Sequence, residues 1–134
     1  MAELTDKRLF LLDMDGTLYL DNDLFPGTIP FLRRIREKGG RYLFLTNNSS
    51  RGADSYVEKL RRLGIGSVPE DFLTSVDALV LFLRKGDYQG KPLYVAGTES
   101  FRRQLRSAGF SVTSDREEAE VLICGFDTEL TFQK

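Results

Sequence analysis

Short apolar runs alternate with segments of helical spacing along most of this 134-residue chain. The clearest runs are RLFLLD (8–13), RYLFLT (41–46), KPLYVAG (91–97) and EVLICG (120–125). A strand without polar alternation is typical of a parallel sheet that is buried on both faces. Because segments of helical period lie between these runs, the pattern predicts βαβ units and an α/β fold with a mostly parallel sheet.

The same pattern predicts where the helices lie. The first holds Ile29, Leu32 and Ile35, with Thr28 as its N-cap and two glycines at 39–40 as its end. Three more are expected over 56–63, over 76–83 with Ser75 as N-cap, and over 98–109, and a short strand is expected at DFLTS (71–75). Composition suggests one boundary, near 74–77.

Composition excludes several classes of function. Lys and Arg total 19 against 20 for Asp and Glu, which argues against nucleic acid or a membrane surface as the main partner. The absence of histidine removes Ser-His and Cys-His catalysis and His-based metal sites. The single cysteine, Cys124, can form no internal disulfide and is expected to be a small buried residue. Since the start has no signal-peptide pattern and no apolar run could span a bilayer, a cytoplasmic protein is expected.

Two carboxylates follow the first apolar run directly, in the sequence Asp13-Met14-Asp15-Gly16-Thr17. Ligands of parallel α/β sheets bind at the carboxyl edge of the strands, and Asp13 and Thr46 both end a predicted strand at that edge. If the backbone stays extended, the side chains of Asp13 and Asp15 point the same way and Met14 points the opposite way. The sequence therefore aims an acidic pair into the edge where a site would form.

Adjacent carboxylates repel each other unless one is protonated or a cation lies nearby, and both solutions suit phosphoryl transfer. One carboxylate can attack phosphorus, a hard divalent ion such as Mg²⁺ can neutralise the gathered charge, and the second carboxyl can move the proton. Thr46 and Asn47 would supply donors to phosphoryl oxygens. The alternative is that Asp-x-Asp-Gly forms a solvated turn and TNNSS a helix-leading loop. Chance would give Asp-x-Asp-Gly-Thr in about one chain in a thousand of this length, which favours the phosphate site.

These motifs also resemble those of a known family. DMDGTLY (13–19) and LFLTNNSSR (43–51) are similar to the first and second motifs of the haloacid dehalogenase superfamily, in its p-nitrophenylphosphatase-like branch. The resemblance implies a Rossmann-like parallel sheet with an inserted α/β cap. It also implies Asp13 as nucleophile and Mg²⁺ ligand, and Asp15 as general acid/base with its carbonyl on Mg²⁺. Phosphate contacts would come from Thr46, Asn47 and the turn at Gly16 and Thr17, whose N–H groups can face the phosphate.

The sequence also departs from the pattern of the family. The family needs a third motif with a Lys and a fourth with further acidic ligands, and GDYQG (86–90) is interpreted as a helix-ending turn rather than the fourth. We therefore expect an N-terminal portion, with half a phosphatase core over 1–75 and the beginning of the cap over 76–134, poorly active alone. The expected substrate is a small phosphomonoester such as a sugar phosphate, a nucleotide or phosphoglycolate, with pairing of two copies through the cap as a further expectation.

Two other functions remain open from the sequence. One is a non-catalytic fragment or binding module of the same fold. The other is a phospho-acceptor signalling domain, in which a partner phosphorylates an Asp at a strand end. Such a domain would carry its acidic pair in an earlier strand, and no such pair precedes Asp13.

Overall fold

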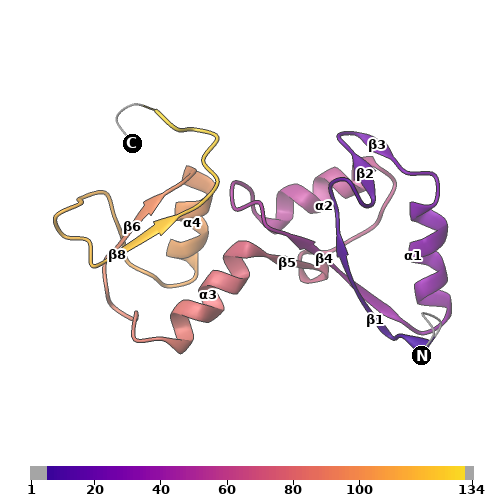
Figure 1. Cartoon of the computed structure of the whole chain (residues 1–134), viewed down its shortest axis with the longest axis horizontal. Coiled ribbons are helices and arrows are strands. Elements are labelled where there is room, and N and C mark those ends of the chain that lie inside the picture. The colour runs from indigo at the N-terminus through magenta and orange to yellow at the C-terminus, as the bar shows by residue number, and fades with distance from the viewer. Residues whose placement is uncertain (1–5, 132–134) are drawn as a thin grey trace. The chain divides into compact units, whose positions relative to one another are not determined.

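The computed structural model describes residues 6–131, and its helices and strands alternate along the chain (Figure 1). The N-terminal elements are β1 (Leu9–Asp13), β2 (Tyr19–Leu20), β3 (Asp23–Leu24), α1 (Thr28–Glu37), β4 (Arg41–Thr46), α2 (Ala53–Arg62), the 3₁₀ helix η2 (Pro69–Asp71) and β5 (Phe72–Thr74). The C-terminal elements are α3 (Ser75–Lys85), β6 (Leu93–Ala96), α4 (Glu99–Ser107), β7 (Val112–Thr113) and β8 (Val121–Cys124). The prediction of an α/β fold with parallel strands is confirmed.

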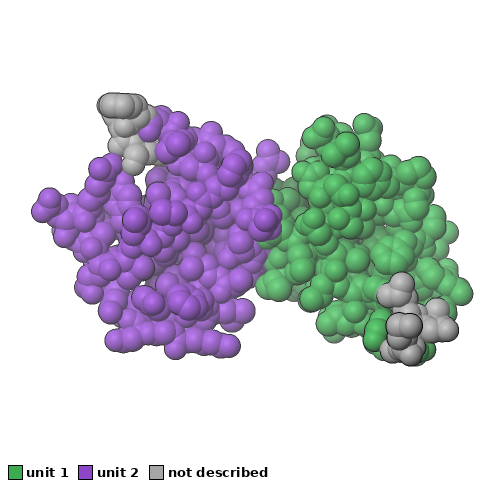
Figure 2. Space-filling view, viewed as in Figure 1, with its two compact units in different colours: residues 1–46, 53–73 green, residues 47–52, 74–134 purple. Residues whose placement is uncertain are grey.

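The chain divides into two compact units (Figure 2). The first holds the chain up to Thr46 together with Ala53–Leu73, and the second holds Asn47–Gly52 and the chain from Thr74 onward. A division between Leu73 and Thr74 lies beside the boundary expected from composition, but the short segment Asn47–Gly52 was expected in the first part. That the units are half a phosphatase core and the beginning of a cap stays a prediction.

The first unit is built on a sheet with strand order β1-β4-β5. Strands β1 and β4 are parallel, in a register that pairs Leu9 with Arg41 and Asp13 with Leu45. One side of this sheet, which we call the covered face, packs against α1 and α2 in one apolar core. The covered face carries Phe10, Leu12, Tyr42, Phe44 and Phe72.

The opposite side of the same sheet, the bare face, is also apolar but is open to solvent. Leu9 and Leu11 of β1 are 58% and 56% exposed, and Leu73 of β5 is 38% exposed. Leu43 and Leu45 of β4 are half-buried. The alternation of exposure along each strand shows that the helices of the first unit lie on one side of its sheet only.

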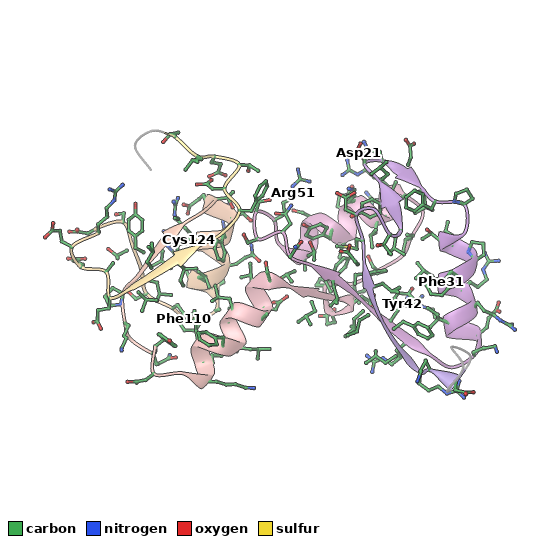
Figure 3. All side chains as sticks on the ribbon, viewed as in Figure 1. Asp21, Phe31, Tyr42, Arg51, Phe110 and Cys124 are labelled. Carbon is green, nitrogen blue, oxygen red and sulfur yellow. The ribbon has the colours of Figure 1, made fainter. Side chains whose placement is uncertain are left out.

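The second unit repeats this arrangement. Its sheet has the order β7-β6-β8, with both outer strands parallel to β6. Helices α3 and α4 supply Leu83, Phe101 and Leu105 to a core that also holds Leu93 and Phe110 (Figure 3). On the other side of this sheet, Leu122 is 67% exposed and Cys124 is exposed.

Several details differ from the sequence-based predictions. Thr28 is not an N-cap: Gly27 holds that position, and the Thr28 hydroxyl donates to the Leu18 carbonyl at 2.7 Å from inside α1. Helix α3 is capped by Thr74 rather than Ser75, because the Thr74 hydroxyl accepts from the Asp77 N–H while the Asp77 carboxylate accepts from the Thr74 N–H. The hairpin β2–β3 and the strand β7 were not expected.

The prediction that Cys124 is buried is wrong, because Cys124 lies on the open side of β8 (Figure 3). The turn at 86–90 does end α3, as predicted, with Gly86 as C-cap. A helix with the length and apolar character that a bilayer span requires is not found over residues 6–131.

Candidate active site

The acidic pair lies where β1 ends. Asp13 is the last residue of β1, and Asp15 forms an isolated parallel bridge with Tyr19. Met14 between them is 1% exposed, whereas both aspartates are exposed. The expected alternation therefore holds: Met14 anchors the segment in the core, and the two carboxylates face solvent beside it.

A tight turn follows the pair and fixes its direction. The Met14 carbonyl accepts the N–H groups of Thr17 at 3.2 Å and of Leu18 at 2.8 Å. Gly16 has a φ of +79°, a conformation that favours glycine, and its N–H donates to the Tyr19 carbonyl at 2.8 Å. The N–H groups of Gly16 and Thr17 are thus engaged inside the turn in this structure. Phosphate contact by the N–H groups of the turn stays a prediction. The Thr17 side chain is exposed.

A buried phenol lies next to the carboxylates. Tyr19 is 1% exposed, and burial is the main cause that raises its pKa to about 12, followed by the charges of Asp15, Tyr56 and Asp13. Of the two aspartates, Asp15 is also joined to Tyr19 through the backbone bridge between them. The Lys59 ammonium of α2 lies 4.0 Å from the centre of the Tyr19 ring, so a cation from α2 packs on this phenol.

Thr46 ends β4, one residue beyond Leu45, the partner of Asp13 in the parallel register. Side chains alternate along a strand, so Thr46 points to the covered face while Leu45 and Asp13 point to the bare face. The Thr46 hydroxyl accordingly donates to the Tyr56 hydroxyl of α2 at 3.3 Å. The structure brings Thr46 to the same edge as Asp13, with its hydroxyl turned towards α2.

Asn47 belongs to the second unit, where its carbonyl accepts from the Ser75 hydroxyl at 3.1 Å and its side chain is exposed. The rest of the predicted loop has structural bonds. The Asn48 carboxamide oxygen accepts from the N–H of Ser50 at 2.9 Å, and the Ser49 hydroxyl accepts from the N–H of Phe126 at 3.0 Å. Phosphate contacts from Thr46 and Asn47 stay predictions.

The metal-binding capacity of these residues is small. Among residues 6–131 no group of three or more acidic or cysteine side chains is arranged to hold a metal ion. Asp13 and Asp15 are exposed carboxylates, which are the hard oxygen donors that Mg²⁺ prefers. The chemical type of the donors fits Mg²⁺, while their number leaves most of an octahedral shell to other ligands.

Sequence reasoning missed two side chains of α2 that contact residues of this site. Tyr56 and Lys59 lie three residues apart on α2, so they share one side of that helix. Tyr56 was counted only as an apolar position, and Lys59 was not singled out. A tyrosine and a lysine at helical spacing directly after the second motif was the available signal.

Comparisons with known proteins agree with this arrangement. Residues 10–111 match the model of a family described as haloacid dehalogenase-like hydrolase. The chain is 30% identical over 127 residues to an acid sugar phosphatase of Staphylococcus aureus, covering 95% of this chain and 48% of the relative. The chain thus spans about half the length of the curated relatives it matches.

Solved structures give the same result. A 4-nitrophenylphosphatase from Thermotoga maritima superposes with a TM-score of 0.87 and 36% identity, covering 96% of this chain and 48% of that one. A glycerol phosphate phosphatase from Mycobacterium tuberculosis, solved in complex with magnesium, superposes with a TM-score of 0.87 and 25% identity, covering 99% of this chain and 40% of that one.

Proposed function

The chain belongs to the haloacid dehalogenase-like hydrolase family, and from this premise we propose that it carries the nucleophilic half of a phosphatase site. The proposed reaction is Mg²⁺-dependent hydrolysis of a small phosphomonoester through an aspartyl-phosphate intermediate. The observation that supports it best is the placement of Asp13 and Asp15. Both are exposed at the carboxyl end of β1 around a buried Met14, beside the end of β4.

Each carboxylate has one role in the proposed reaction. A carboxylate oxygen of Asp13 attacks phosphorus, and the ester P–O bond breaks as Asp15 gives its proton to the leaving alcohol. Water then attacks phosphorus of the aspartyl phosphate while Asp15 takes a proton from it. The P–O bond to Asp13 breaks, inorganic phosphate leaves, and the Asp13 carboxylate is restored.

The Asp13 carboxylate and the main-chain carbonyl of Asp15 would hold Mg²⁺. When bound, the ion neutralises the charge that the carboxylates and the phosphate bring together. Thr46 and Asn47 would hold the phosphoryl oxygens, which requires the Thr46 hydroxyl to turn away from Tyr56. Lys59 adds a positive charge next to Tyr19, at 4.0 Å from the centre of its ring.

The substrate class follows from the relatives, whose names include an acid sugar phosphatase and a glycerol phosphate phosphatase. We propose a small phosphorylated metabolite of the sugar phosphate, nucleotide or phosphoglycolate type. The relatives carry about as much sequence again outside the matched half. Because few metal ligands are present among residues 6–131, turnover by these 134 residues alone is expected to be low.

The test measures Mg²⁺-dependent hydrolysis of 4-nitrophenyl phosphate by this chain and by Asp13→Asn. We expect the variant to lose all Mg²⁺-dependent turnover, because an amide cannot attack phosphorus. Asp21→Asn is the matched control: Asp21 has a φ of 51°, which Asn tolerates, so the same chemical change leaves the fold and the activity unchanged. Where the wild-type rate is measurable above a control without Mg²⁺, equal activity of Asp13→Asn and the wild type would exclude the proposed nucleophile.

A second function is supported by the small number of metal ligands among the described residues. A module that binds Mg²⁺ weakly, together with phosphate, and does not turn over would need only Asp13, Asp15 and the turn that follows them. Beryllium fluoride mimics an aspartyl phosphate and distinguishes the two functions. Labelling of Asp13 with measurable hydrolysis supports the phosphatase, and saturable Mg²⁺ and phosphate binding with neither labelling nor hydrolysis supports the binding module.

A further inference from the structure

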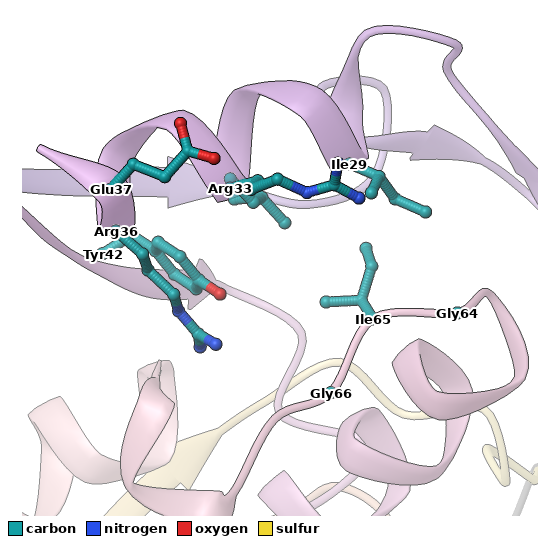
Figure 4. A pocket seen from close by; sticks show the side chains of 9 residues that line it. Ile29, Arg33, Arg36, Glu37, Tyr42, Gly64, Ile65 and Gly66 are labelled. Carbon is teal, nitrogen blue, oxygen red and sulfur yellow. The ribbon is translucent and has the colours of Figure 1, made fainter.

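A pocket of about 300 Å³ lies in the first unit, between α1 and the segment that follows α2 (Figure 4). The start of β4 contributes Tyr42 to its wall. Tyr42 is four residues before Thr46 on this strand, which corresponds to about 13 Å at the rise of an extended chain. The pocket is therefore at the opposite end of the strand from the acidic pair and is separate from the candidate active site.

The base of the pocket is apolar, and the far wall, which is formed by the segment after α2, has no side chain at two positions. Leu32 and Ile65 are 5% and 4% exposed, and the Ile65 side chain points back toward α1 in Figure 4. On the far wall, Gly64 has a φ of +82°, and no atom lies within 4 Å of where a Cβ of Gly66 would be. The absence of side chains at both glycines lets a flat group approach the backbone, and the volume is at the lower end of the range for small-molecule sites.

The charge of the pocket is positive. Arg33 and Arg36 line it from α1, both are exposed, and neither forms an ion pair with any residue of the described chain. The guanidinium of Arg36 lies 4.8 Å from the centre of the Tyr42 ring, which holds it at the wall. The one acidic residue of the lining, Glu37, pairs with Arg34 at 3.7 Å, so the lining holds two arginines against one glutamate.

We infer that this pocket binds a small aromatic anion, a single flat ring that carries one phosphoryl, phosphonyl or carboxyl group. The ring lies on the apolar base beside Ile65, and the oxyanion accepts hydrogen bonds from the guanidinium groups of Arg33 and Arg36. Guanidinium groups suit such oxyanions because their paired N–H donors match two oxygens at once. The inference does not depend on the proposed phosphatase chemistry, because no residue of the acidic edge lines the pocket.

The test uses phenylphosphonate, whose carbon–phosphorus bond is not an ester and is not cleaved by ester hydrolysis. EDTA is present, so that no metal ion attracts the anion to Asp13 and Asp15. Binding is followed from the ³¹P line width and from saturation transfer to the ring protons. We expect phenylphosphonate to bind at least about tenfold tighter than inorganic phosphate, which lacks the ring, and than benzyl alcohol, which lacks the charge.

Two variants locate the binding. Arg36→Gln and Arg33→Gln are each expected to weaken phenylphosphonate at least about fivefold, since each removes a charged donor. Arg62→Gln makes the same change on α2, outside the pocket, and should leave the affinity unchanged; circular dichroism checks that all three fold. Absence of saturable binding, equal binding of inorganic phosphate, or an equal loss in Arg62→Gln would each overturn the inference.

Discussion

The two faces of the sheet β1-β4-β5 have similar composition and very different environments. Phe44 on the covered face is 0% exposed and Leu12 is 9% exposed, while Leu11, the neighbour of Leu12 on the bare face, is 56% exposed. Residues on both faces are mostly Leu and Phe. The difference lies in what packs on them: α1 and α2 contribute to the core on the covered face, and no helix formed by residues 6–46 or 53–73 lies on the other face.

The apolar side chains of the bare face are thus suited to a second packed layer, which α1 and α2 do not supply. Parallel strands that are apolar on both faces are typical of sheets with a layer on each side. The second unit repeats the pattern, since Val95 is 2% exposed and Leu122, on the opposite face of its sheet, is 67% exposed. An apolar face that is open to solvent marks a surface suited to association.

The largest effect should separate the two faces directly. Phe44→Ala is expected to lower the free energy of unfolding by about 3–5 kcal/mol, because it empties a fully buried site. Leu11→Ala should lower it by less than about 1 kcal/mol, since more than half of that side chain is already in water. Urea unfolding followed by circular dichroism measures both. Comparable losses would show that the bare face is covered in solution, and a dependence on protein concentration would identify a second copy as the cover.

A pH titration tests the burial of Tyr19 in the core of the covered face. Tyr19 belongs to the core on that side, and its pKa is raised from 10.0 to about 12. Below pH 10 the phenol is neutral in both states. Between pH 10 and 12 the unfolded chain loses the proton while the folded chain keeps it, so the free energy of unfolding should fall by about 3 kcal/mol.

Tyr19→Phe should remove most of this alkaline decrease. Burial also raises the pKa of Tyr42, so a smaller decrease should remain in the variant. The measurement is the thermal midpoint of wild type and variant from pH 8 to pH 12. An unchanged slope in Tyr19→Phe would show that Tyr19 is not buried in a neutral state.

A smaller effect is expected in the second unit, at the N-terminus of α3. Thr74 is 2% exposed and caps α3, while Ser75 is half-buried and donates to the Asn47 carbonyl. Thr74→Ala should lower the free energy of unfolding by about 1 kcal/mol, as loss of an N-cap does. Ser75→Ala, the matched control, should lower it by less than half as much. A larger loss for Ser75→Ala would support the cap predicted from the sequence.

The longer helices and strands were predicted well from the sequence, because each contains enough residues to show its hydrophobic period. The apolar runs that became β1, β4, β6 and β8 and the four helices were all placed within a few residues. The hairpin β2–β3 and the strand β7 have two residues per strand, which is too short to show any period. The cap of α3 was shifted by one residue because Thr and Ser adjoin there and both are good N-caps.

Only the features of the candidate site that depend on neighbouring residues in the sequence could be predicted. Alternation around Met14 was enough to place Asp13 and Asp15 on one side of β1, and the same rule turns Thr46 toward α2. The contacts of Tyr19 with Lys59 join segments about forty residues apart, and they depend on how α2 packs on the sheet. Hydrogen bonds that occupy the N–H groups of Gly16 and Thr17 depend on the turn geometry, which Asp-Gly alone does not determine.

The smallest expected effect on stability is at Cys124. This residue was expected to be buried because the alternation of side chains between the two faces of a strand was not considered for the apolar run EVLICG. Cys124 pairs with Ala96 across the β6–β8 ladder and is exposed, whereas Ile123 beside it is 7% exposed. Cys124→Ser should therefore change the free energy of unfolding by less than about 0.5 kcal/mol. For the same reason, the native thiol should react with Ellman's reagent within a few-fold of its rate in denaturant. Protection that grows with protein concentration would mean that two copies cover this face, and protection at every concentration would mean that the described exposure of β8 does not hold in solution.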